Sequence, residues 1–437
     1  MIACRTTSKG CEVRKTILLL LVSAMLLGLL GCSQPVSGQV LQSNKPRDTS
    51  PVVEKTELAK LVDGNNAFAF DLFQVLRQKE SNLFYSPYSI SEALAMTYAG
   101  ARGETEKDMA EALNFILSQD RLHPAFNSLD LQLKQRGEGA KGKDDEGFRL
   151  HVVNAIWGQK DYKFLEEFLD VLAQNYGAGL RILDFINETE QSRLTINEWV
   201  SDQTEEKIED LIPPGVINQL TRLVLTNAIY FNAAWQHPFN EDDTSDGLFH
   251  LLSNSEITVP MMKQTESFRY AEDDDYQAVE LYYDGQELSM VILLPKAGEY
   301  KAFEEKLDAV FVKAITNDLE TREVALTMPK FEYESSFRLK EALKTLGMGV
   351  AFTANADLSG MNGKRDLFIQ DVLHKAFVSV DEAGTEAAAA TAVIVGLTAL
   401  PPEPVAVTID RPFIFFIRDI PTDSIVFVGR VLNPASK

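Results

Sequence analysis

The chain has 437 residues, of which 45% are hydrophobic, and its 64 acidic and 42 basic residues give it a formal net charge of -22. Such a chain can bury a large core, but it offers no basic face for phosphate groups, so we exclude nucleic acid as a partner. All three cysteines lie within the first 32 residues, and the five histidines show no metal-ligand spacing such as HExxH. We therefore expect no disulfide, no metal site and no cofactor in the body of the protein.

The N-terminus has the layout of an export signal. An apolar run at residues 17–30 follows a basic stretch and is too short to span a bilayer comfortably. The sequence LLGC that ends at Cys32 resembles a bacterial lipobox, in which the cysteine is acylated after cleavage. We predict a lipoprotein signal peptide at residues 1–31 and a lipid anchor at Cys32, facing the periplasm or the cell exterior. The alternative is a plain secretory signal with an incidental cysteine, which would give a secreted protein.

Residues 32–54 are rich in Ser, Pro, Gln and Asn and lack hydrophobic periodicity, which predicts a flexible tether. The body that follows, residues 55–437, contains no internal repeat and no second linker. We therefore predict one continuous domain.

The body begins with helical patterns and continues with strand patterns. Apolar residues recur at helical spacing over 58–76, and further helices are predicted at 90–99, 104–113, 163–175 and 190–207. Runs rich in β-branched and aromatic residues predict strands at 150–157, 223–231, 288–294, 324–329, 377–380, 405–409, 412–418 and 425–431. Because helices dominate the first half and strands the second, we predict an α+β fold with antiparallel or mixed sheets.

Several segments of the body resemble serpins, and they occur in the order and at the spacing of that family. They include NLFYSPYSISEALAMTYAGARGET at 82–105, TNAIYFNAAWQHPF at 226–239, MPKF at 328–331, VTIDRPFIFFI at 407–417 and GRVLNP at 429–434. The resemblance implies three β-sheets, about nine helices and an exposed loop near the C-terminus that peptidases attack.

Residues 382–399 correspond to this loop. Taken alone, the run EAAAATA also suits a short helix or linker, because alanine has the best helix propensity. If the segment forms a strand, every second side chain from Thr385 onward lies on one face. These side chains are uncharged and the first four of them are small, while Glu386 points to the other face. A strand that slides into an existing sheet needs such a face, so the pattern favours insertion. The predicted hinge residues are Glu382, Gly384, Thr385, Ala387, Ala388, Ala389, Ala390 and Thr391.

The resemblance implies how the loop acts. A target serine peptidase attacks the bait bond and forms an acyl-enzyme, and the freed loop then inserts into the sheet and traps this covalent complex. The protein would be used once, as a monomer, and would not be an enzyme. The loop length of the family, counted from Glu382 and from Pro401, places the bait bond at Thr398–Ala399, with Leu397–Thr398 as the alternative.

The residues around this bond indicate the class of target. Residues 396–399 contain no Lys or Arg, which disfavours trypsin-like targets. Thr398 suits elastase-like or subtilisin-like enzymes, whereas cleavage after Leu397 would suit chymotrypsin-like ones.

Two further groups of residues match the family. The shutter, a hydrogen-bonded cluster beneath the centre of the main sheet, consists of Ser86, Ser89, Asn227 and His374. The breach, where insertion begins, consists of Trp235, Lys330 and Glu382, with Lys330 placed to pair with Glu382. The plainer interpretation of the breach is a core tryptophan and a solvated ion pair.

Two other functions are weighed against inhibition. A catalytic Ser89–His374 pair would make the protein a hydrolase, but no GxSxG or other nucleophile motif supports it. The other alternative is a non-inhibitory serpin that acts as a binding or chaperone protein. Non-inhibitory members tend to carry bulky, charged or proline residues in the hinge, and this hinge carries only the outward Glu386.

Overall fold

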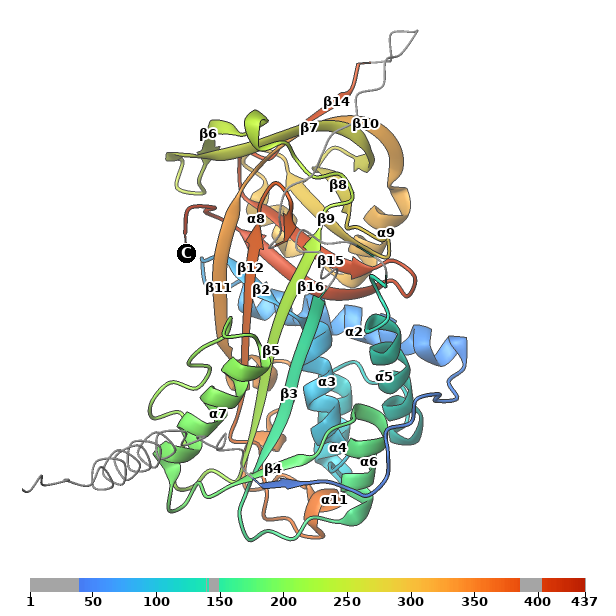
Figure 1. Ribbon diagram of the computed structural model, residues 1–437, viewed down its shortest axis with the longest axis vertical. Coiled ribbons are helices and arrows are strands. Elements are labelled where there is room, and N and C mark those ends of the chain that lie inside the picture. The colour runs from blue at the N-terminus through green and yellow to red at the C-terminus, as the bar shows by residue number, and fades with distance from the viewer. Residues whose placement is uncertain (1–38, 139, 141–148, 386–402, 437) are drawn as a thin grey trace, which may run out of the picture. The chain divides into compact units, whose positions relative to one another are not determined.

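The computed structural model describes residues 39–138, 140, 149–385 and 403–436 (Figure 1). The predicted signal peptide, the lipidation site Cys32 and the loop residues from Ala387 to Ala399 lie outside the described residues. Helices within the described residues are α2 (Lys55–Leu76), α3 (Pro87–Tyr98), α4 (Gly103–Ala112), α5 (Gln119–Leu133), α6 (Glu166–Tyr176), α7 (Thr189–Gln203), α8 (Tyr300–Lys306), α9 (Ala309–Asp318), α10 (Lys340–Thr345) and α11 (Ser359–Asn362), with short 3-10 turns η1 (Glu241–Asp243) and η2 (Val350–Phe352).

The strands fall into two hydrogen-bonded sheets, which we call sheet A and sheet B. Sheet A has the order β1 (Gln39–Leu41), β4 (Leu180–Leu183), β3 (Arg149–Gln159), β5 (Leu223–Ala234), β13 (Gly384–Thr385), β12 (Asp371–Val380), β11 (Phe331–Arg338). Sheet B has the order β14 (Val405–Thr408), β10 (Glu320–Pro329), β7 (Glu256–Glu272), β8 (Tyr276–Tyr282), β9 (Leu288–Pro295), β15 (Phe413–Asp419), β16 (Ser424–Val431), β2 (Leu83–Tyr85), and β6 (Ser245–His250) pairs with β7.

Helix starts follow local chemistry. Helix α2 begins with a capping box, in which the Glu54 backbone N–H donates to the Glu57 carboxylate at 3.0 Å. Helix α3 begins at Pro87, whose missing N–H costs nothing at the first helical position, and the Ser86 side chain accepts from the Ser89 N–H. The same cap therefore fixes two of the residues predicted for the shutter.

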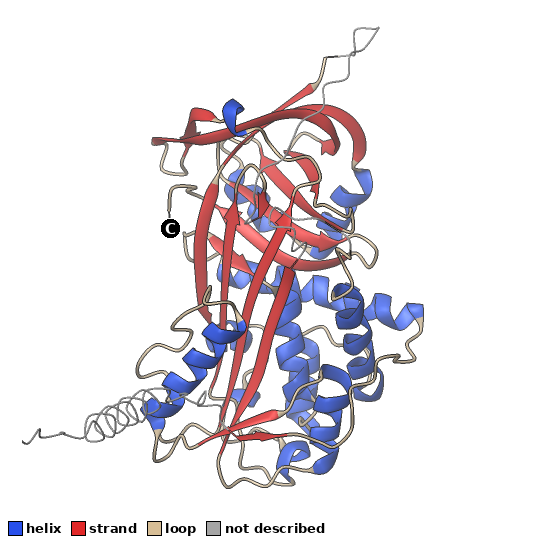
Figure 2. Ribbon diagram, viewed as in Figure 1, coloured by secondary structure: helices blue, strands red, loops and turns tan. Residues whose placement is uncertain are grey.

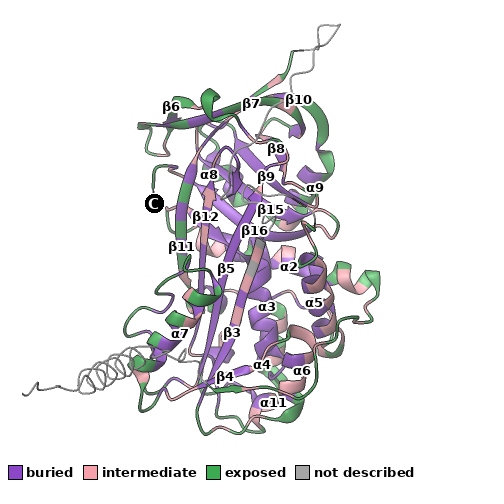
Figure 3. Ribbon diagram, viewed as in Figure 1, coloured by how far each residue is buried: buried purple, intermediate pink, exposed green. Residues whose placement is uncertain are grey.

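Sheet A is covered on both faces. Helix α3 contacts β3 and β5 on one face, and α7 lies over the other face, in front of the sheet in Figure 1. Side chains of β5 alternate accordingly: Leu225 and Ile229 join the main core, whereas Val224 and Ala228 join a separate cluster beneath α7. Figure 3 shows β5 buried along nearly its whole length. A polar residue in the middle of β5, such as Asn227, must therefore find its partners inside the protein.

The α+β class is confirmed, with most helices around the lower half of sheet A in the view of Figure 2. The resemblance implied three sheets, and the described strands form two because the 17-residue β7 is continuous and joins strands at both of its ends. Among the described residues, no helix is both long and apolar enough to cross a membrane.

The predicted tether is ordered from Gln39 onward, so the prediction of a flexible linker up to residue 54 is wrong for this part. Strand β1 pairs antiparallel with β4, with Val40 opposite Arg181. Lys45 binds Asp170 at 2.6 Å, and Arg47 binds Asp130 at 2.5 Å. Composition alone missed this contact because β1 has only three residues and its partners lie far along the chain.

Candidate functional site

The candidate site lies at one end of sheet A, where β5 and β12 separate. Below this point the two strands pair in parallel, from Val224 with Asp371 to Ile229 with Ala376. Above it, β13 lies between them: Thr385 pairs with Val380 of β12 and with Ala233 of β5. The first two residues of the predicted inserting segment thus already form a short strand within the sheet.

A glycine is required at position 384 because the backbones of β13 and β5 approach each other closely there. A Cβ atom at this position would lie 2.2 Å from the carbonyl oxygen of Ala233 and 2.7 Å from the Cα of Ala234. Any other residue would push β13 away from β5. The sequence predicted a hinge here, and the structure places this glycine where backbone meets backbone.

Thr385 is almost fully buried, with 1% of its surface exposed. Its hydroxyl lies 2.9 Å from the hydroxyl of Tyr283, which is also buried. Thr385 therefore points inward, as the alternation in the sequence predicted, and a small polar side chain suits this position. Tyr283 was not predicted, since no pattern in the sequence links it to the hinge.

Trp235, the residue that follows β5, supports the hinge. Its ring stacks on Tyr283 with centroids 4.7 Å apart, and its Nε1 donates to the backbone oxygen of Asp381 at 3.0 Å. Its backbone N–H also donates to the oxygen of Ala383 at 2.8 Å. Trp235 thus holds the turn through which the chain leaves β12 and enters β13.

Glu382 and Lys330 meet beside this turn. The Glu382 carboxylate accepts from Lys330 Nζ at 2.5 Å and from Thr244 Oγ1 at 2.7 Å, and its side chain is 7% exposed. Burial raises the pKa of Glu382, but its hydrogen bonds with Lys330, Thr244 and the backbone, together with the charge of Lys330, outweigh burial and hold its pKa below the usual value. The structure therefore brings all three predicted breach residues around the start of β13. Thr244 was missed, because a lone threonine in a loop carries no signal.

The four predicted shutter residues also come together, further down the sheet. His374 and Asn227 are register partners on β12 and β5, and His374 Nδ1 is hydrogen-bonded to Asn227 Oδ1. The Ser86 N–H donates to His374 Nε2 at 3.2 Å, and Asn227 Nδ2 donates to Ser89 Oγ. Burial lowers the pKa of His374 to about 3, so its ring is neutral at physiological pH.

This geometry argues against a hydrolase. Both ring nitrogens of His374 are engaged by Asn227 and by the Ser86 N–H, so the ring has no nitrogen free to take a proton from Ser89. The cluster is also buried beneath sheet A, away from any substrate. Its bonds instead link β12 to β5 and to the start of α3.

One shutter partner was not predicted. Asn154 of β3 accepts from Asn227 Nδ2 and lies 3.4 Å from Ser89 Oγ. A signal was present: Asn154 interrupts the apolar run 150–157 that predicted the strand. A polar residue inside a buried strand indicates an internal hydrogen-bond partner.

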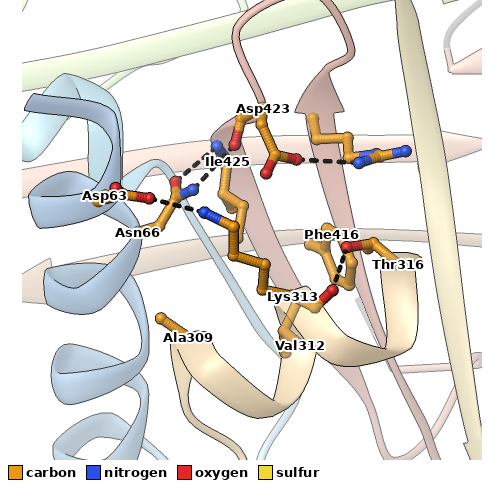
Figure 4. Close-up of a pocket in the computed structure, with 10 residues that line it drawn as sticks. Asp63, Asn66, Ala309, Val312, Lys313, Thr316, Phe416, Asp423 and Ile425 are labelled. Carbon is orange, nitrogen blue, oxygen red and sulfur yellow. Dashed lines mark hydrogen bonds and ion pairs between the residues drawn. The ribbon is translucent and has the colours of Figure 1, made fainter. Parts of the chain in front are cut away.

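A pocket between α2, α9 and sheet B is too small to compete as a binding site (Figure 4). Its volume is about 40 Å³, and the ion pair between Lys313 and Asp63, 2.9 Å long, crosses it. Asn66 bridges the backbone of Asp423 and Ile425 on its other side. Within the described residues, no group of three or more His, Cys, Asp and Glu side chains is placed to hold a metal ion.

These features define the class: an α+β protein whose main sheet is parted at one end by the start of its own loop and closed below by a buried polar cluster. A family model described as "Serpin (serine protease inhibitor)" matches residues 63–434. The chain therefore belongs to the serpin family.

Similar proteins come from distant organisms. An uncharacterised serpin-like protein of Thermococcus kodakarensis is 38% identical over 97% of this chain and 99% of its own length. Leukocyte elastase inhibitor A of Mus musculus is 41% identical over 86% of this chain and 100% of its own length. The crystal structure of uncleaved ovalbumin matches with a TM-score of 0.76 at 25% identity, over 86% of this chain and 100% of ovalbumin.

Proposed function

We propose that this serpin inhibits serine, or cysteine, endopeptidases as a suicide substrate, trapping the acyl-enzyme by inserting its loop into sheet A. The observation that carries the proposal is the position of β13, which has Gly384 and Thr385 between β5 and β12. Below β13, strand β12 continues to Asp371. Ten residues of β12 extend over about 33 Å at 3.3 Å per residue, which is the length that a further strand would have to cover.

The targets we propose are elastase-like or subtilisin-like enzymes. The predicted bait bond Thr398–Ala399 presents small side chains and no cation. Several similar proteins, including those of mouse and human, are named leukocyte elastase inhibitors. We further propose a monomer, exported and anchored through Cys32 to a membrane.

Covalent complex formation tests the inhibitor. The mature protein, incubated with an elastase-type and a subtilisin-type enzyme, should give an adduct that survives SDS, together with a C-terminal fragment that starts at Ala399. Cleavage without an adduct would show that the protein is only a substrate of the peptidase, and the non-inhibitory serpin would then be the remaining alternative. A fragment that starts at Thr398 would move the bait bond by one residue.

Replacement of Thr385 tests insertion itself. Thr385→Arg requires a guanidinium in a position that is 1% exposed, so this variant should be cleaved without forming an adduct. Glu386→Arg is the matched control, because alternation places residue 386 on the outward face, and it should still form the adduct. Equal adduct yields from the two variants would contradict insertion.

The anchor has its own test. Cells that express the full chain are labelled with a fatty-acid probe, and the label should be lost in Cys32→Ala. Retention of the label in that variant would place the lipid elsewhere, and an unlabelled wild-type protein would mean a plain secretory signal.

A further inference from the structure

The hydrogen bonds of the shutter run in one direction. The Ser86 N–H must donate to His374 Nε2, so the ring proton is on Nδ1 and is donated to Asn227 Oδ1. Asn227 then presents its Nδ2 to Asn154 Oδ1, and Asn154 in turn donates Nδ2 to Glu92 at 2.8 Å. The chain of bonds therefore ends on a carboxyl group, whose charge determines how strongly it accepts.

Glu92 lies on α3 and is 7% exposed. Tyr88 on the same helix lies 3.5 Å from Glu92 and 3.5 Å from Asp130 of α5, which is also buried. Lys134 binds Asp130 at 2.7 Å. The Tyr176 hydroxyl of α6 is hydrogen-bonded to His123 Nδ1 at 2.7 Å, and burial together with the charge of Glu92 raises the pKa of Tyr176. Burial, together with the negative charge of Asp130, raises the pKa of Glu92 well above its usual value.

A cation reaches this acidic pair from the N-terminal segment. Arg47 Nη2 binds Asp130 at 2.5 Å, and Arg47 Nε binds Asn127 at 2.8 Å. The Arg47 side chain is 18% exposed, whereas that of Lys134, the other cation on Asp130, is 55% exposed and hence more strongly hydrated. The charges of Lys134 and of Arg47 both act to lower the pKa of Glu92. The segment is held beside α6 by a bond from the Asp48 N–H to the Gln174 oxygen at 2.9 Å.

We propose that Arg47 is a positioning residue for the shutter: by neutralising Asp130 beside Glu92, it keeps the terminal acceptor of the hydrogen-bond chain in place and so helps hold β5 and β12 together. Without the guanidinium, Asp130 keeps only the more exposed Lys134 as its cation, and above the raised pKa of Glu92 the two ionised carboxylates repel each other across Tyr88. Displacement of Glu92 then removes the acceptor of Asn154, which in turn loosens its bond to Asn227. The N-terminal segment is thereby coupled to the opening of sheet A.

Hydrogen exchange measures this opening directly. The full mature chain is exchanged in the absence of any target peptidase. Amide exchange is then followed by mass spectrometry in peptides that cover 223–229 and 371–376. Arg47→Ala should accelerate exchange there by about tenfold or more, the equivalent of one pKa unit of lost interaction. Lys45→Ala is the matched control: it lies in the same segment and binds Asp170 at the surface, so it should change these peptides little.

A second substitution separates neutralisation from simple docking. Glu92→Gln keeps an acceptor for Asn154 but removes the charge, so it should restore slow exchange in the Arg47→Ala background. After correction for intrinsic exchange, the excess exchange of Arg47→Ala should increase from pH 6 to pH 9 and lose this pH dependence in the double variant. The proposal is overturned if Arg47→Ala and Lys45→Ala behave alike, or if Glu92→Gln gives no rescue, since the segment would then act only by covering the surface.

Discussion

His374 of β12 and Asn227 of β5 lie directly opposite each other in the one parallel pair that joins these strands, and their side chains hydrogen-bond across it. The bond lies in the path that an inserting strand must take between β5 and β12. The two strands are thus held together by polar groups, which can exchange one partner for another, as well as by apolar contacts. The properties of this pair lead to the first two predictions.

We expect the fold to lose stability in mild acid because of His374. Its pKa is about 3 in the folded protein against 6.5 for a free histidine, so below pH 6.5 the unfolded state binds a proton that the folded state does not. The free energy of unfolding is therefore unaffected by the titration of this histidine above pH 6.5. It decreases as the pH drops toward 3, by about 2 kcal/mol at pH 5. Urea unfolding at pH 7 and pH 5 measures it.

His123 acts in the same direction, because burial lowers its pKa to about 4. His374→Gln should therefore flatten the pH dependence in part, and His374→Gln combined with His123→Gln should flatten it further. A pH profile that is unchanged in both variants would show that other groups control acid sensitivity.

Asn227→Ala should destabilise the protein. The substitution removes the hydrogen bonds that His374 Nδ1, Asn154 Oδ1 and Ser89 Oγ each make to Asn227 in a buried site, which predicts a loss of about 2–4 kcal/mol in the free energy of unfolding. Asn232→Ala on the same strand is the control, because within the described part of the chain the Asn232 side chain bonds only to the Tyr230 hydroxyl, and it should cost less than about 1 kcal/mol. Equal losses of unfolding free energy in the two variants would mean that the shutter contributes no more to stability than an ordinary hydrogen bond.

Gly384→Ala should expel β13 from the sheet. The added methyl group would meet the Ala233 oxygen, so Thr385 should leave its contact with Tyr283. Because Trp235 stacks on Tyr283, we expect a change in tryptophan emission, which a Trp235→Phe background should abolish. Gly349→Ala, where nothing lies within 4 Å of the new methyl group, should leave the spectrum unchanged.

Lys330→Met should weaken the breach, because Glu382 would stay buried with Thr244 as its remaining side-chain donor. Since Lys330 itself is 37% exposed, the expected loss is modest, about 1–2 kcal/mol in urea unfolding. Adding Glu382→Gln should recover most of it. Lys263→Met, which removes an exposed bond to Ser245, serves as control, and a loss as large as that of Lys330→Met would argue against a specific role for the pair.

The sequence predicts those elements whose pattern is local. The helix expected at 104–113 is α4 (Gly103–Ala112), and the strand expected at 223–231 is β5 (Leu223–Ala234). Helix α5 was missed because Pro124 interrupts its first turns, and β7 was missed because its exposed and buried residues do not alternate regularly. Tertiary contacts stabilise both elements, and a local pattern does not record them.

The site also combines residues that a sequence pattern reveals with residues that depend on tertiary contacts. Family motifs located the shutter and the breach, but for β12 the apolar pattern predicted only residues 377–380, because Asp371, His374 and Lys375 break the run. These polar side chains are buried and have specific partners: Asp371 binds Arg338, and Lys375 binds Glu334. Burial of a polar group depends on its partner, which lies elsewhere in the chain.

The pairing of Thr385 with Val380 has a consequence for the register of a longer inserted strand. In an antiparallel pair each step forward on one strand is a step back on the other, so six further residues bring Thr391 opposite His374. In the proposed inserted form, Thr391 would then face the main core, and its hydroxyl would be placed to replace Asn227 as the hydrogen-bond partner of the His374 ring. If insertion occurs as proposed, the last residue of the predicted hinge would be the one that meets the shutter, and a substitution there should affect the middle of the insertion, after β13 has formed.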